Sequence, residues 1–151
     1  MTFHLVHQHS LDQARSPFHI VEHETGREVA WINRYLDREW VRRLAETSLR
    51  SYALDLLHFL RWWIGVHHTD AVTEAALTES TLLDYVRFQS GQQLRPAAAS
   101  INRRIIVVEQ NHSAQLYHHL IGQKAIPPSA ESVARPGPLP FRPSEIASYV
   151  V

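Results

Sequence analysis

Two short segments combine hydroxyl side chains with arginine in the same order. They are SLRSY at 48–52 and SINRR at 100–104. If each begins a helix, its first turn offers unpaired backbone N–H groups and a partial positive charge, and both attract phosphate. The hydroxyl and guanidinium donors beside that turn suit phosphate oxygens and base edges. The segments therefore indicate nucleic-acid contact, unless the hydroxyls are ordinary helix caps and the arginines ordinary solvated residues.

Helical periodicity surrounds the first segment. Apolar side chains spaced by four residues predict a first helix over about 30–45. Thr47 or Ser48 is then expected to be the N-cap of a second helix, with Gly65 just past its end as the C-cap. Its broad apolar face comprises Leu49, Tyr52, Ala53, Leu56, Phe59, Leu60 and Trp63. Trp62, beside this face, is expected to be exposed.

Two further helices are expected downstream. One covers about 80–89 and precedes Gly91. The other begins at or just after Pro96, carries apolar residues at spacings of three and four, and ends at Gly122. His112 lies on the apolar side of this last helix and is expected to be a core histidine. Together the four helices predict an all-α bundle with one shared core.

The segments on either side of the four helices are not predicted to be helical. Two β-prone runs within 17–31, around a Thr25-Gly26 turn signal, predict a short hairpin, and the residues before Pro17 are expected to form a mobile tail. Most of the chain's eight prolines follow Lys124, where they exclude a continuous helix or a central strand. The expected organisation is an N-terminal tail with a hairpin (1–28), a helical domain (29–122) and a Pro-rich interdomain linker (123–151).

Composition excludes several kinds of site and one class of nucleic-acid-binding protein. The chain has no Cys, which excludes disulfides, thiolate metal sites and Cys nucleophiles. Fifteen basic and fifteen acidic residues give zero net charge, which argues against a protein that coats polyanions generally. Basic residues gather in 29–66 and 87–124, and fourteen of the fifteen are Arg. This bias suits contact with phosphate or guanine, although GC-rich coding produces it too.

The eleven histidines show no recognised metal-ligand spacing. No metal and no cofactor is therefore expected, and a His-dependent metal protein is kept as an alternative. No apolar run approaches the ~18 residues of a membrane span, and the N-terminus lacks a cationic lead into an apolar stretch. We expect a cytoplasmic protein that does not bind membranes.

Two segments of the chain resemble motifs of a known protein family. TSLRSYALDLLHFLRWW, at 47–63, resembles the second-helix signature of the N-terminal core-binding domain of tyrosine recombinases, the phage-integrase family. That signature runs approximately Thr-Leu-Arg-Ser-Tyr-x-x-Asp-Leu-x-x-Phe-Leu-x-Trp, and Ser48 takes the place of its Thr. SINRRI resembles the start of that domain's fourth helix, Thr-Ile-Asn-Arg-Arg-Leu, with Ser100 again replacing Thr. The resemblance extends over about 29–120, with the two motifs at the expected separation.

The resemblance implies a four-helix, SAM-like integrase core-binding bundle that forms half of a C-shaped clamp on duplex DNA. Its second and fourth helices would lie at the major groove, in a protein of bacterial or phage origin associated with the nucleoid. Its partners would be double-stranded DNA and other recombinase subunits, which form a tetramer on DNA. The implied DNA-binding residues, with their neighbours, are Thr47, Ser48, Arg50, Ser51, Arg95, Ser100, Asn102, Arg103 and Arg104.

The catalytic reaction of this family needs a set of residues that this chain does not show together. A tyrosine nucleophile attacks phosphate with the help of two arginines, a lysine and histidine. The domain that carries them would begin about where this chain ends. His58 and Arg61 spell a His-x-x-Arg pair, but inside the second predicted helix, and Tyr149 has no such partners in its Pro-rich segment. The chain is therefore not expected to be an enzyme. The alternative is a non-catalytic helical module that associates with recombinase subunits.

Overall fold

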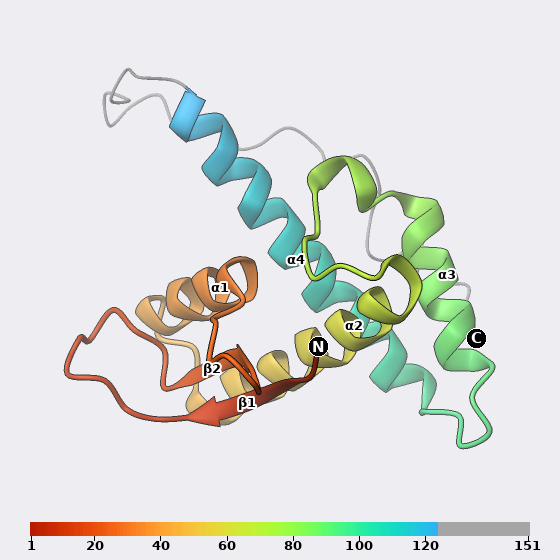
Figure 1. Ribbon diagram of the computed structural model, residues 1–151, viewed down its shortest axis with the longest axis horizontal. Helices are drawn as coiled ribbons and strands as arrows, with labels where there is room; N and C mark the ends of the chain where they lie inside the picture. The colour runs from red at the N-terminus through yellow and green to blue at the C-terminus, as the bar shows by residue number, and fades with distance from the viewer. Residues whose placement is uncertain (124–151) are drawn as a thin grey trace. The chain divides into compact units, whose positions relative to one another are not determined.

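The structure is a computed structural model that describes residues 1–123, apart from the side chains of Glu74 and of residues 114–123. Residues 124–151, most of the predicted linker, lie outside the described part. The described part is mostly helical, with four α-helices and a two-stranded antiparallel hairpin near the N-terminus (Figure 1). The elements are β1 (Phe3–His7), β2 (Phe18–Glu22), α1 (Ala30–Val41), α2 (Glu46–His67), the 3₁₀ turn η1 (Glu74–Ala76), α3 (Glu79–Ser90) and α4 (Ala98–Gln123).

The chain divides into two compact units. The first comprises residues 1–73 and contains the hairpin, α1 and α2. The second starts at Glu74 and contains η1, α3 and α4. The boundary falls inside the 29–122 segment that the sequence predicts as one helical domain. None of the helices in residues 1–123 is both long enough and apolar enough to cross a bilayer.

The hairpin is present, but one of its strands is not where the sequence predicts it. β2 matches the first predicted run. Its partner is β1, which lies in the segment expected to be a mobile tail. The pairing runs from Phe3 opposite Glu22 to His7 opposite Phe18. The second predicted run supplies only an isolated bridge, Val21 to Glu28. The turn before it forms as expected, with Gly26 at φ 68°. The run cannot continue as a strand because α1 begins at Ala30.

The first unit is built around the hairpin and two helices. Both strands pack against α2, and β2 also packs against α1 (Figure 1). At one end of β1, Arg61 of α2 donates a hydrogen bond to the Phe3 carbonyl at 3.0 Å. Trp62 and Trp63 are both buried, so the expectation that Trp62 is exposed is wrong. The buried apolar residues of this unit include Phe3, Phe18, Ile20, Ile32, Leu36, Leu49, Leu56, Phe59 and Leu60.

The ends of α2 also differ from the expectation. Its N-cap is Ala45, which makes no side-chain capping bond, so Thr47 and Ser48 are the second and third residues of the helix rather than caps. Gly65 lies inside the helix, and the C-cap is His68, in the left-handed conformation at φ 56°. A glycine can be accommodated within a helix, and here the helical packing of the flanking residues outweighs its tendency to end one.

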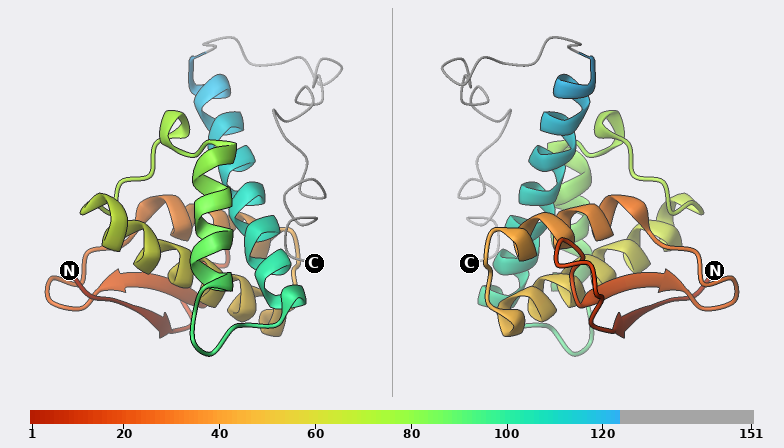
Figure 2. Two further views of the ribbon diagram at one scale, coloured as in Figure 1. Left: turned by 90° about the vertical axis from the view of Figure 1, so that its right-hand side faces the viewer. Right: turned by 90° about the vertical axis from the view of Figure 1, so that its left-hand side faces the viewer.

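The second unit contains an antiparallel helix pair. α3 is capped by Thr78, whose hydroxyl accepts a hydrogen bond from the Thr81 N–H at 3.3 Å. α4 begins after Pro96, as predicted, and runs beside α3 in the opposite direction (Figure 2). Gly122 lies in the last turn of α4 instead of beyond it. The buried apolar residues of this unit include Leu77, Leu82, Tyr85, Val86, Ile101, Ile105 and Val108, and His112 is buried as expected.

Candidate nucleic-acid interface

The predicted DNA-binding residues fall into two helical corners, one in each unit. We call residues 42–51, which join α1 to α2, the α1–α2 corner. We call residues 91–104, which join α3 to α4, the α3–α4 corner. In both, the predicted residues cluster at the beginning of the second helix of a pair. The first corner holds Thr47, Ser48, Arg50 and Ser51, and the second holds Arg95, Ser100, Asn102, Arg103 and Arg104.

In the α1–α2 corner, the side chains at the start of α2 are accessible. Thr47 and Arg50 are exposed, whereas Ser48 and Ser51 are half-buried. The Ser51 hydroxyl donates to the Thr47 carbonyl at 3.1 Å, so it bonds back into its own helix. Thr47 and Arg50 are therefore the members of this set best placed to meet a ligand.

This helix start combines an uncapped N-terminus with one acidic residue in its first turn, Glu46. No side chain caps α2, so the N–H groups of its first turn are left for solvent or a ligand. These groups and the helix dipole give the turn a partial positive charge. Within the described part of the chain, Arg50 makes no hydrogen bond or ion pair. Its guanidinium is thus available to an incoming phosphate.

Two arginines of this corner were not among the predicted residues. Arg42 is 67% exposed and lies 3.6 Å from Glu39. Arg43 is exposed and makes no ion pair or hydrogen bond with any side chain that the structure describes. The sequence shows both as a pair shortly before the motif, within the range predicted for the first helix. The corner therefore carries three exposed arginines.

Arg43 has an unusual backbone. Its φ is 69°, the left-handed region that non-glycine residues rarely adopt. Its N–H bonds to the Trp40 carbonyl at 3.0 Å, and the Leu44 N–H bonds to the Glu39 carbonyl at 3.0 Å. This is the Schellman pattern that ends many helices, in which the left-handed position is usually Gly. An exposed arginine therefore occupies a position where glycine would be less strained.

In the α3–α4 corner, exposure separates the predicted residues into two groups. Arg95 and Arg103 are exposed, and Ser100 is half-buried. Arg104 is half-buried and donates from Nη1 to the Oε1 of the buried Gln89 at 2.9 Å, which joins α4 to α3. The segment 91–104 contains no acidic residue. Arg95 and Arg103 therefore provide the accessible positive charge here, and Arg104 also supports the helix pair.

Asn102 lies between these two groups. It is half-buried, and its Oδ1 is buried without a hydrogen-bond partner among the described residues. An amide oxygen in this position is costly to leave unpaired, because burial removes it from water. The side chain therefore retains an unused acceptor near the start of α4.

The His-x-x-Arg string of α2 has a structural role. Arg61 holds the Phe3 carbonyl of β1, and His58 is half-buried on the same helix. The two residues are one helical turn apart, and the guanidinium of Arg61 is directed to the hairpin. Arg61 therefore helps to fasten β1 to α2.

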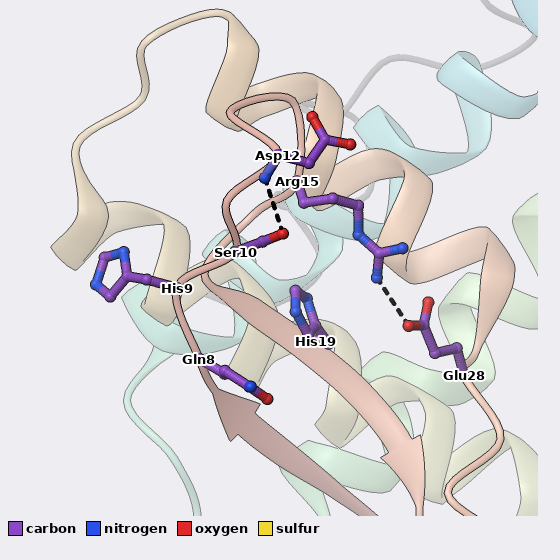
Figure 3. Close-up of a pocket in the computed structure, with 7 residues that line it drawn as sticks. All are labelled: Gln8, His9, Ser10, Asp12, Arg15, His19 and Glu28. Atoms are coloured by element: carbon purple, nitrogen blue, oxygen red, sulfur yellow. Dashed lines mark hydrogen bonds and ion pairs between the residues drawn. The ribbon is translucent and has the colours of Figure 1, made fainter.

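A polar hollow of about 450 Å³ lies elsewhere in the first unit (Figure 3). Arg15 and Glu28 form an ion pair of 2.7 Å inside it, and Arg15 also lies 3.8 Å from Asp37. The hydrogen bond from Arg15 lowers the pKa of Glu28. Arg15 and Glu28 are therefore engaged with each other inside the hollow. Its lining residues are Gln8, His9, Ser10, Asp12, Arg15, His19 and Glu28.

A scan of protein-family models finds no match to this chain, and searches of curated proteins and of solved structures find none either.

Proposed function

We propose that this chain binds duplex DNA as the non-catalytic N-terminal region of a site-specific tyrosine recombinase. The observation that carries the proposal is the start of α2, where Arg50 is exposed beside an uncapped helix N-terminus. Such a terminus and an arginine fork together bind phosphate oxygens. The resemblance of 47–63 and 100–105 to the two DNA-facing motifs of that family supports the same role.

The corners would contact both phosphates and base edges. Arg43, Arg50 and Arg103 would neutralise phosphates, which sets affinity and position on the duplex. Thr47, which is exposed, would be closer to base edges, and Asn102 belongs to the proposed DNA-facing set through the resemblance alone. The proposed setting is DNA integration and recombination in the cytoplasm of a bacterium, at the nucleoid. By itself the chain would bind DNA without cutting it.

The test is a fluorescence-anisotropy titration of labelled duplex DNA at two salt concentrations. Non-specific binding in the range of about 10⁻⁴ to 10⁻⁶ M is expected at physiological salt, with higher affinity at low salt. Arg50→Ala should weaken binding. Arg34→Ala is the matched control, because Arg34 is an exposed arginine of α1 outside both corners. Equal affinity in the two variants would argue against the α1–α2 corner as the interface.

A second candidate function is association with recombinase subunits. Leu94 is 91% exposed in the α3–α4 corner, and Phe88, near the end of α3, is 42% exposed. Large exposed apolar side chains are more typical of protein contacts than of DNA contacts. Light scattering without DNA distinguishes the two functions. Self-association that Leu94→Ser abolishes would favour this second function, whereas a monomer that retards DNA would favour the first.

A further inference from the structure

The first residue of α2 meets two histidines from the N-terminal segment. The His7 Nε2 lies 3.1 Å from the Glu46 Oε1, and the His9 Nε2 lies 3.6 Å from the same oxygen. One ligand atom from each residue lies within 4.8 Å of the other two. We propose that His7, His9 and Glu46 form a binding site for a divalent transition-metal ion, for which Zn²⁺ is the probe.

The distances suit such an ion. Bonds of about 2.0–2.2 Å from Zn²⁺ to imidazole nitrogen and carboxylate oxygen, at tetrahedral angles, separate neighbouring ligand atoms by roughly 3.3–3.5 Å. The two separations from Glu46, 3.1 and 3.6 Å, are close to that value. Two histidines and one glutamate form a known zinc ligand set, which leaves a coordination position for water or another ligand. Imidazole ligands favour Zn²⁺, Ni²⁺ or Cu²⁺ over Mg²⁺ or Ca²⁺.

Part of the site is fixed before any ion binds. The ring of His7 stacks on Phe18 of β2 at 4.6 Å with 15° between the planes, and His7 pairs with Phe18 in the hairpin register. Glu46 is fixed at the first turn of α2. His9, two residues beyond His7, lies next to the His7 ring at 5.3 Å. His9 follows the end of β1 and is the ligand least fixed by secondary structure.

The site is accessible, and it does not use the ion pair of the polar hollow. The side chains of His7, His9 and Glu46 are 54%, 65% and 42% exposed, so an ion can enter from solvent. His9 also lines the hollow, but its ring points away from Arg15 and Glu28 (Figure 3). The ligands of the proposed ion are therefore distinct from the internal ion pair of the hollow.

A bound ion would join two elements that are distant in sequence. His7 and Glu46 are 39 residues apart, at the end of β1 and the start of α2. At the other end of β1, Arg61 already holds Phe3. The ion would fasten the second end of the strand to α2. It would also offset the negative charge of Glu46, one turn from Arg50.

The test is isothermal titration of Zn²⁺ into the untagged 151-residue chain, because a histidine tag would bind the ion itself. The wild type should bind one Zn²⁺ per chain, and its thermal unfolding midpoint should rise with Zn²⁺. His9→Asn and Glu46→Gln should each weaken this binding by more than about tenfold and remove the rise in the midpoint. Co²⁺ bound in place of Zn²⁺ should give visible absorption bands that both variants lose.

His68→Asn is the matched control. His68 is exposed and lies outside the cluster, and its left-handed backbone is one that asparagine tolerates. This variant should bind Zn²⁺ like the wild type. The proposal is overturned if His9→Asn and Glu46→Gln bind Zn²⁺ as tightly as the wild type, because the other histidines would then be responsible. Absence of Zn²⁺ binding to the wild type would overturn it too.

Discussion

Asn33 of α1 holds the backbone of Ile20 in β2 with both ends of its amide. Its Oδ1 accepts a hydrogen bond from the Ile20 N–H at 2.8 Å, and its Nδ2 donates to the Ile20 carbonyl at 3.1 Å. Both residues are buried. β2 is therefore held on one side by β1 and at its centre by α1, which fixes the hairpin to the first helix.

Asn33→Leu should destabilise the first unit because it leaves the buried Ile20 N–H without its acceptor. The Ile20 carbonyl retains the Val29 N–H, at 3.0 Å. The expected loss is about 2 kcal/mol in the free energy of unfolding, measured by urea denaturation. Arg34→Ala, at the exposed neighbouring position, should change it by less than about 0.5 kcal/mol. Similar midpoints for the two variants would show that the clamp contributes little.

Arg43→Gly should raise the stability of the chain while lowering its affinity for DNA. Glycine removes the cost of the left-handed conformation, roughly 1–2 kcal/mol, but increases the backbone entropy lost on folding by roughly 0.5–1 kcal/mol. The net expectation is a gain of about 0.5–1 kcal/mol in stability. The same variant loses an exposed cation of the α1–α2 corner, so its DNA affinity should fall.

His68→Gly is the control for that comparison. His68 is the other non-glycine residue with positive φ in the described part of the chain, at 56°, and it caps the far end of α2. Its replacement should raise stability by a similar amount and leave DNA affinity unchanged. A loss of DNA affinity in both variants would indicate that flexibility, and not charge, explains the effect at Arg43.

Glu109 of α4 should make the chain less stable as pH rises. It is buried, neither carboxylate oxygen has a hydrogen-bond partner among the described residues, and burial raises its pKa to about 7. In the unfolded chain the pKa is about 4.5. Between these values the folded chain binds more protons than the unfolded chain, so stability falls from about pH 4.5 to pH 7 and then levels off. The expected loss is roughly 3 kcal/mol.

The measurement compares the wild type with Glu109→Gln in urea at pH 5 and pH 8. The difference between the two proteins isolates Glu109, because every other ionisable group is common to both. The glutamine variant should gain stability relative to the wild type on going to pH 8. An equal difference at the two pH values would mean that Glu109 has an ordinary pKa in the folded chain.

The helices could be predicted because the apolar spacing that indicates each one lies within its own segment. Apolar spacing identifies α1, α2, α3 and α4, and the Thr78 cap and Pro96 lie where helix starts usually have such residues. The strand β1 was missed because five residues have too little periodicity, and its stability comes from α2 and β2, which are distant in sequence. The cap at Thr47 or Ser48 was wrong because α2 starts at Glu46 without a side-chain cap.

The site was predictable to a smaller extent. Spacing located Arg50 and Arg103 at helix starts, and both are exposed. It could not show that Arg104 bonds to Gln89, because that contact depends on how α3 and α4 pack. It also could not join His7 to Glu46, which are 39 residues apart. Side-chain partners from different elements are set by tertiary packing, which a local pattern does not contain.

The central claim is that exposed arginines of each corner bind duplex DNA, and a salt-dependent DNA titration of four proteins tests it most directly. These are the wild type, Arg50→Ala, Arg103→Ala and the double variant. Each single variant should weaken binding and lower the slope of log affinity against log salt by about 1, and the double variant should lower it by about 2. An affinity and slope in the double variant equal to those of the wild type would contradict the account.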